Sequence, residues 1–387
     1  MHSIRKIIWS FSWLMIAVVS MLVCSCNGKN GGMTKASDDP VDTFSYKGYT
    51  NLANILAGKG CDDADFLADI TSSKAYETYK AAMTTTWGRY RASDVDVMRK
   101  WSKENLQQPA DTVFYPFGGP DFNYLACFFP DCRYSVLVGL EGVGKQPFMD
   151  KVSKDHYSEV LTGMRAILTT NTGLSYFHTL LHMEETLDPY LKGTMPVIMM
   201  YAALHGYEVI TVNPVKMSSD GSLAYVHPEK VFAHTMDKGD GDGFEMLYRQ
   251  PGEKGARKLY YLCSDLSDKV FPTSGMSKLI EKNFHNKLTF LKVASYLLHE
   301  DEFSLLRQSL LDNSNVIFSG PSGMPFSAYD SKLWTLRPFG KYMAPIPEFA
   351  DYQQEDLKAF YKTVKPEPID FRFDYHSSAS LILATKK

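Results

Sequence analysis

The region that follows the amino-terminal segment places hydrophobic residues at intervals of three or four. Residues 51–106 carry two stripes of large side chains with this spacing. The first stripe consists of Tyr76, Tyr79, Met83 and Trp87, and the second consists of Val95, Met98 and Trp101. Side chains at such intervals lie on one face of a helix. The pattern therefore predicts an amphipathic helical lead-in over residues 46–110.

Short β-rich runs replace the helical pattern further along the chain. Residues 112–117 form such a run, residues 118–121 are a glycine-containing turn, and residues 122–129 have helical character. A second apolar run, 134–140, ends at Glu141. A strand, a helix and a second strand within about 30 residues make a βαβ unit, whose two strands are expected to be parallel.

The rest of the chain continues this alternation. Helices are predicted at 158–168, 174–187, 196–204, 288–298, 303–311 and near 354–361. Strands are predicted at 208–213, 258–263, 315–319 and 333–338, with a one-sided closing strand at 369–375. Residues 224–232 and 244–249 are expected to pair as a hairpin. Together the elements predict an α/β domain over residues 111–387, with a Rossmann-like, mainly parallel sheet and a β-hairpin insertion.

The first 26 residues have the order of an export signal. Arg5 and Lys6 precede an apolar run at 7–23, and a small residue precedes Cys26. This order resembles a bacterial lipoprotein signal with a lipobox, so we expect residues 1–25 to be removed and Cys26 to carry acyl chains such as palmitate. The alternative is an uncleaved transmembrane anchor, but the apolar run is short for a span and contains several serines.

A polar tether is expected between the lipid and the fold. Residues 26–45 are mainly small and polar, with nothing to bury. No acidic cluster follows Cys26 directly, which favours a periplasm-facing position at the outer membrane over the cell surface. The sequence thus predicts a cell-envelope protein whose partner is the membrane, through its amino-terminal lipid.

Composition and charge narrow the class of protein. The chain of 387 residues is 44% hydrophobic and 22% charged, which is typical of a globular protein. The formal net charge is −3, and the lysines and arginines are scattered rather than clustered. Because nucleic-acid binding depends on a basic surface, nucleic acid is not expected as a partner.

Two cysteines allow a disulfide in the oxidising compartment to which the signal leads. Cys127 and Cys132 are separated by four residues and could form a local bridge. The alternative is that both are buried thiols. Because Cys127 lies in the apolar run 124–129, where a free cysteine behaves as a small hydrophobe, we favour the buried thiols.

The turn after the first predicted strand is the most suggestive candidate site. Gly118, Gly119 and Asp121 are followed by Glu141 at the tip of the next strand. In nucleotide-binding folds such glycines let a ligand approach the backbone, and such an acid accepts hydrogen bonds from ribose hydroxyls, a geometry similar to that of Rossmann-like methyltransferases. The turn is not GxGxxG, however, and Pro120 removes a backbone donor. Alternatively, Asp121 caps the following helix and Glu141 pairs with a nearby basic residue.

A second candidate is a metal site on the predicted helix 174–187. His178, His182 and Glu185 have the spacing that places side chains along one helical face, and these ligand types can bind a divalent metal. HExxH is absent, so the zinc-protease arrangement does not apply. The favoured interpretation is a structural hydrogen bond between neighbours on the helix.

Three segments together resemble a known group of sequences. They are Tyr115 to Phe122 (YPFGGPDF), Leu137 to Glu141, and Leu291 to Leu297 (LKVASYL). This combination is similar to that of an uncharacterised family of bacterial exported lipoproteins. The resemblance implies a shared fold and an exported location, and it brings no established activity.

Two functions remain as hypotheses. The first is a binding or envelope-accessory module that uses the mouth of the sheet as a pocket for a small-molecule or envelope ligand. The alternative is an envelope hydrolase or transferase on a degenerate methyltransferase-like fold, in which a metal held by His178, His182 and Glu185 could assist the reaction. Binding is favoured because the sequence shows no complete set of nucleophile, base and orienting group. The ligand and any cofactor stay unassigned.

Overall fold

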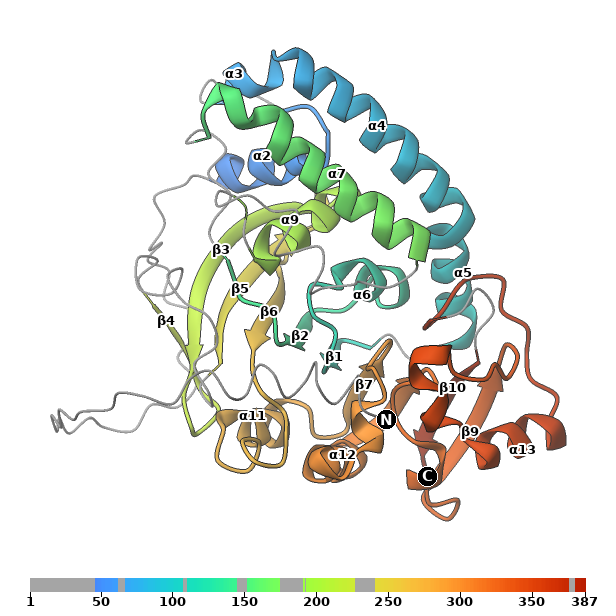
Figure 1. Cartoon of the computed structure of the whole chain (residues 1–387). Coiled ribbons are helices and arrows are strands. Elements are labelled where there is room, and N and C mark those ends of the chain that lie inside the picture. The colour runs from blue at the N-terminus through green and yellow to red at the C-terminus, as the bar shows by residue number, and fades with distance from the viewer. Residues whose placement is uncertain are drawn as a thin grey trace, which may run out of the picture. The chain divides into compact units, whose positions relative to one another are not determined.

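A mixed β-sheet of ten strands runs through the protein (Figure 1), in the order β4-β3-β5-β6-β2-β1-β7-β8-β10-β9. The computed structural model describes residues 46–61, 67–106, 110–144, 152–174, 191, 193–226, 241–375 and 380–387. The strands are β1 (Thr112–Tyr115), β2 (Tyr134–Gly139), β3 (Glu208–Met217), β4 (Leu223–Tyr225), β5 (Asp242–Arg249), β6 (Arg257–Cys263), β7 (Lys287–Leu291), β8 (Ser314–Ser319), β9 (Trp334–Phe339) and β10 (Leu381–Lys386). This architecture confirms the predicted α/β class.

The centre of the sheet is parallel and both flanks are antiparallel. Strand β1 pairs in parallel with β2 and β7, β2 pairs in parallel with β6, and β7 pairs in parallel with β8. All the other pairings of this sheet, which involve β3, β4, β5, β9 and β10, are antiparallel. The prediction of a mainly parallel sheet is therefore wrong, because antiparallel strands flank the parallel core on both sides.

Hydrophobic side chains on both faces explain why the central strands form. In β1, Val113 and Tyr115 are buried in the core on one face, and Phe114 is buried in the core on the other. Strands covered on both faces have such continuous apolar runs. The short helix α6 (Phe122–Phe128) connects β1 to β2, which confirms the predicted βαβ unit.

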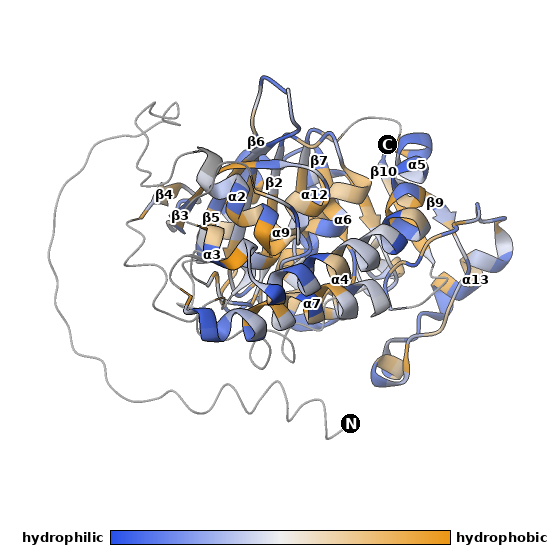
Figure 2. Cartoon of the chain, turned by 90° about the horizontal axis from the view of Figure 1, so that it is seen from above, coloured by the Kyte–Doolittle hydropathy of each residue, from blue (hydrophilic) through white to orange (hydrophobic). Residues whose placement is uncertain are grey.

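Helices cover both faces of the sheet. One hydrophobic core receives residues from α2 (Tyr46–Leu56), α4 (Lys74–Tyr90), α5 (Asp96–Asn105), α6, α7 (Tyr157–Leu174) and α9 (Thr194–Leu204). The second core receives residues from α11 (Gly275–Asn283), α12 (Ser304–Asn313) and α13 (Glu355–Thr363). Figure 2 shows α9 hydrophobic along its length, as expected of a fully buried helix, while α4 and α7 also carry hydrophilic positions.

The predicted helical lead-in is confirmed, and it packs onto the sheet. The buried stripe of α4 contains Tyr76, Tyr79, Met83 and Trp87, as the spacing predicts. A π-helical turn, η2 (Arg91–Val95), joins α4 to α5, while α3 (Ala68–Thr71) precedes α4. Helix α2 also covers the edge of β3, because Tyr49 Oη and Thr50 Oγ1 donate hydrogen bonds to the carbonyls of Val212 and Val209, at 3.2 and 2.9 Å. Residues 43–387 form one compact unit.

The predicted helix over 288–298 is wrong, because its only helical residues belong to a short 3-10 turn at Leu297–His299. Residues Lys287–Leu291 form β7 beside β1, and the chain then turns sharply. Val293, Ser295 and Tyr296 have φ values of 55°, 52° and 58°, in the left-handed region that no helix of L-residues continues. A short apolar run fits a buried strand as well as a helix, and here pairing with β1 and β8 decides between them.

Two strand pairings also differ from the prediction. Strand β5 pairs with β3 and β6, whereas β4 pairs with β3, so the expected hairpin between 224–232 and 244–249 does not form within residues 224–226 and 244–249. The closing strand is β10 rather than 369–375, where the structure shows irregular backbone. Alternating side chains predicted that strand, but the ladder positions between β8 and β9 are taken by β10.

Some expectations fall on parts of the chain outside the described residues. These parts include the signal, the tether and most of the predicted helix 174–187. Among the helices that the structure describes, none is long and apolar enough to cross a membrane.

Candidate functional site

The order of the parallel strands reverses between β1 and β7. Strands β2 and β6 follow β1 on one side, and β8 follows β7 on the other. In open α/β sheets, ligands bind outside the carboxyl ends of the strands at such a point. The loops that leave β1, β2, β7 and β8 therefore form the candidate site.

The structure places the glycine turn beside Glu141. A Cβ atom built on Gly119 would lie 3.2 Å from Oε2 of Glu141, and one built on Gly139 would lie 2.3 Å from the same oxygen. Tyr261 Oη donates to the carbonyl oxygen of Glu141 at 2.7 Å and contacts Oε2 at 3.3 Å. The carboxylate of Glu141 thus folds back over glycine backbone and takes a tyrosine as partner, rather than the basic residue considered from the sequence.

Asp121 points into the protein interior. Its carboxylate accepts a hydrogen bond from the backbone N of Tyr124 at 3.2 Å, which caps α6, and one from Tyr115 Oη at 2.9 Å. Burial raises the pKa of Asp121, while Lys292 and the hydrogen bonds act in the opposite direction. The alternative in which Asp121 is a helix cap is confirmed. Since Asp121 is 5% exposed, it adds little charge to an open mouth.

Lys292 is the partner of Asp121 that sequence reasoning missed. Its Nζ atom lies 3.8 Å from Oδ2 of Asp121 and 3.6 Å from the ring centroid of Tyr124. The side chain is fully buried, and burial lowers the pKa of Lys292. The available signal was a lysine directly after the apolar run 288–291, within the segment that was predicted as a helix.

A serine clamp holds the neighbouring loops. Ser322 Oγ donates to Oδ1 of Asp374 at 2.8 Å, and its backbone N donates to Oδ2 at 3.1 Å. The backbone N of Ala294 donates to Ser322 Oγ at 3.1 Å. Because Ser322 follows β8 and Ala294 follows β7, the clamp joins both loops to the segment that contains Asp374.

Unusual backbone conformations concentrate at this edge. Positive φ values outside glycine occur in the described residues at Phe117, Asn286, Val293, Ser295, Tyr296 and Asp374. Except for Asn286, these residues lie in the loops that follow β1 and β7 or in the segment clamped by Ser322. Such conformations cost about 1 to 3 kcal/mol each and persist only where the surroundings hold them. The loops at this edge are therefore held in a defined shape.

These contacts determine what the site can do chemically. Lys292, Asp121, Asp374 and Ser322 are all 5% exposed or less. Each carries charge or a hydroxyl, yet each is engaged by protein groups rather than directed at solvent. The protein's own side chains thus occupy the crevice at the strand reversal.

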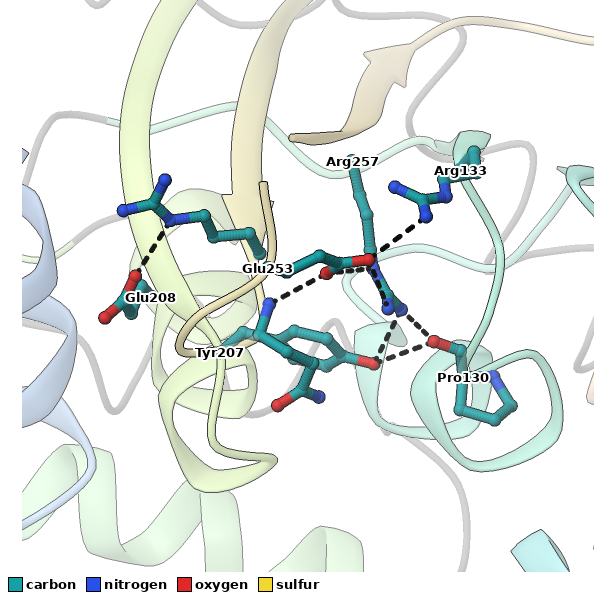
Figure 3. A network of polar contacts seen from close by, with 8 residues as sticks. Pro130, Arg133, Tyr207, Glu208, Glu253 and Arg257 are labelled. Carbon is teal, nitrogen blue, oxygen red and sulfur yellow. Dashed lines mark hydrogen bonds and ion pairs between the residues drawn. The ribbon is translucent and has the colours of Figure 1, made fainter. Parts of the chain in front are cut away.

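A second polar network lies at the opposite ends of the strands (Figure 3). Arg257, the first residue of β6, donates to both carboxylate oxygens of Glu253 and also to the carbonyl of Pro130. Arg133, which precedes β2, contacts the same glutamate at 3.2 Å. Tyr207 Oη donates to Pro130 O at 3.2 Å. This network joins the loops at the amino ends of β2 and β6, which is a structural role.

The remaining predicted site residues divide into two groups. Cys26, His178, His182 and Glu185 lie outside the described residues. Within the described part of the chain, no three metal-binding side chains come together. Cys127 and Cys132 are buried free thiols, as favoured from the sequence. Burial raises the pKa of the Cys132 thiol to about 12, so this thiol is not reactive at neutral pH.

Comparison with known proteins finds no matching family model, no similar curated protein and no similar solved structure. The functional argument therefore depends on the fold and on the contacts described above.

Proposed function

We propose that the fold is Rossmann-like. If the inserted strands β3, β4 and β5 are set aside, the others can be numbered along the chain from one to seven, and the sheet order becomes 3-2-1-4-5-7-6. The first five positions follow the order of dinucleotide-binding sheets. The antiparallel last strand, inserted between the fifth and sixth, is similar to the arrangement in Rossmann-like methyltransferases.

On this fold, the protein would act as a lipid-anchored binding or accessory module of the cell envelope rather than as a nucleotide-dependent enzyme. The observation that carries this proposal is the buried pair of Lys292 and Asp121 at the strand reversal. A cofactor that entered there would have to displace a fully buried lysine from its carboxylate. Leaving either charge buried without a partner costs several kcal/mol.

Glu141, which is partly exposed at this edge of the sheet, also supports the proposal. Glu141 lies beside Gly119, where a nucleotide's phosphates would approach the backbone, and its negative charge disfavours phosphates. The export signal ending at Cys26 supports a location away from the cytoplasmic cofactor pool. We place the anchored protein at the outer membrane, facing the periplasm.

The test is a thermal unfolding series on the mature chain without its lipid. S-adenosylmethionine and adenosine are suitable ligands because they carry no phosphate that could bind to basic groups elsewhere on the protein. A shift in Tm would therefore report binding in the crevice at the strand reversal. A bound ligand at about 100 times its Kd stabilises a protein by about 2.7 kcal/mol, which raises Tm measurably. We expect no shift. A saturable rise in Tm that Glu141→Gln abolishes would overturn the proposal.

The strand order also favours a second candidate function, that of an envelope hydrolase or transferase with the same fold. In that case His178, His182 and Glu185 could supply a metal. The metal content of the purified chain separates the two candidates.

A further inference from the structure

We propose that an anion with phosphate chemistry binds at a cationic cluster beside the carboxyl end of α9. The cationic cluster consists of Lys59, Arg91, Arg99 and the imidazole of His205. Lys59 follows α2, Arg91 begins η2, Arg99 lies on α5, and His205 caps the carboxyl end of α9. Four separate elements thus contribute groups to this cluster.

The hydrogen bonds of His205 define its protonation state. Arg99 Nη2 donates to His205 Nδ1 at 2.8 Å, and because a guanidinium only donates, Nδ1 carries no proton. Nε2 of His205 then donates to Asn123 Oδ1 at 2.9 Å, and Asn123 Nδ2 donates to Tyr90 Oη at 2.9 Å. His205 is therefore neutral, and it orients Arg99 without neutralising its charge.

The positive charges of the cluster are poorly compensated. Lys59 Nζ donates to the carbonyl of Ala203 in α9, and Arg91 forms an exposed ion pair with Asp96 at 3.6 Å. Across the described residues, no carboxylate forms an ion pair with Lys59 or Arg99. Burial, followed by the positive charge of Arg91, lowers the pKa of Lys59.

Arg99 also has an unused donor. Its Nε atom is buried and has no hydrogen-bond acceptor among the described residues. A buried donor without an acceptor is unfavourable, so such groups normally have a partner. The side chains of Arg99 and Lys59 as a whole are only partly buried, so an anion would meet their exposed atoms first and would reach Arg99 Nε after a shift of the side chain.

Phosphate chemistry matches these features. A phosphate presents several acceptor oxygens, one of which could accept from Arg99 Nε while others face Lys59 and Arg91. Its charge would offset the repulsion among the three cations. The ligand could be free phosphate or a lipid headgroup.

The experiment measures binding of inorganic phosphate to the mature chain by calorimetry and by the rise in Tm. Lys59→Gln and Arg99→Gln each remove one charge of the cluster, and Lys103→Gln removes an exposed charge from the same helix α5 as a matched control. We expect the wild type and Lys103→Gln to bind equally, and both cluster variants to lose at least about tenfold in affinity, since one charge-assisted hydrogen bond contributes about 1.5 to 3 kcal/mol. If Arg99→Gln fails to fold, the affinities of Lys59→Gln and Lys103→Gln for phosphate are compared instead.

A direct readout is the Arg99 Nε resonance in a nitrogen NMR titration, which should move when phosphate is added. Vesicles of phosphatidylglycerol and of phosphatidylcholine then identify the source. Cluster-dependent binding to the anionic vesicles assigns a headgroup, and phosphate binding without vesicle binding assigns a soluble anion. No phosphate binding by the wild type, or equal binding by all variants, would overturn the inference.

Discussion

Lys292 and Asp121 form an ion pair in the protein interior, with 3.8 Å between Nζ and Oδ2, and so connect the loop after β7 to the loop after β1. The pair lies where the order of the parallel strands reverses. Tyr124 faces the ammonium group and Tyr115 donates to the carboxylate, so both charges have further polar or aromatic partners. The place where open α/β sheets generally bind ligands is here part of the folded core.

Removing one member of this pair should destabilise the protein strongly. Lys292→Met leaves the Asp121 carboxylate buried without its cation, and we expect a loss of about 3 to 5 kcal/mol in the free energy of unfolding. Urea titration followed by circular dichroism measures this loss. The double variant with Asp121→Asn should recover part of it, because the uncompensated charge is gone. Lys358→Met, which removes a half-exposed lysine from an ion pair with the exposed Glu355, should unfold nearly like the wild type; a similar midpoint for Lys292→Met would contradict the role of the buried pair.

The backbone around Glu141 predicts a sharp difference between two glycines. In Gly139→Ala, the new Cβ would lie 2.8 Å from the Cα of Gly119 and against the carboxylate of Glu141. Relieving such a clash costs about 1 to 3 kcal/mol. Gly142→Ala is the matched control, because nothing lies within 4 Å of its added Cβ. Thermal unfolding of both variants tests the geometry, and equal Tm values would show that Glu141 does not lie over Gly139.

Stability should depend on the protonation of His205. Burial, followed by Arg99, Lys59 and Arg91, lowers the pKa of this histidine well below 6.5 in the folded protein. As pH falls below 6.5, the unfolded chain takes up a proton that the folded chain refuses, so folding becomes less stable by up to about 1.4 kcal/mol per pH unit.

The variant His205→Gln isolates this contribution. Glutamine keeps one acceptor for Arg99 and one donor for Asn123 but does not titrate. Between pH 7 and pH 5, urea unfolding should show a steeper loss of stability for the wild type than for the variant. Identical pH profiles would mean that His205 ionises as freely in the folded protein as in the unfolded chain.

The lipid anchor gives a prediction in cells. Replacing Cys26 by Ala removes the only residue to which the lipobox directs acyl chains, so the protein should move from the membrane fraction to the soluble fraction. Fractionation with an antibody to the mature chain measures this. Membrane retention with an uncleaved amino terminus would favour a transmembrane anchor instead.

Metal content distinguishes the binding module from the metal-assisted enzyme. If His178, His182 and Glu185 have a structural role, elemental analysis of the purified chain should find no stoichiometric zinc. His178→Ala should then change stability alone. About one tightly held zinc per chain, lost in that variant, would favour the enzyme, because affinity depends on the number of correctly placed ligands.

Local sequence patterns determined a large part of this fold. The stripe from Tyr76 to Trp87 specifies a helix with one buried face, and the apolar runs on either side of the Gly118 turn specify the βαβ unit. Both depend on the periodicity of side chains within one segment, which the order of residues contains in full. The proximity of Glu141 to Gly119 also follows, because adjacent parallel strands end at the same edge.

Tertiary structure decided the elements that depend on distant partners. Residues 287–291 have an apolar run that suits either a helix or a strand, and pairing with β1 and β8 makes it a strand. The ladder between β8 and β9 is completed by β10 rather than by 369–375. Burial of Lys292 follows from the first of these choices, since a lysine after a central strand enters the interior whereas one on an amphipathic helix can stay in solvent. Sequence periodicity indicates which residues share one face of a helix or strand. Only long-range pairing determines which other element packs against that face.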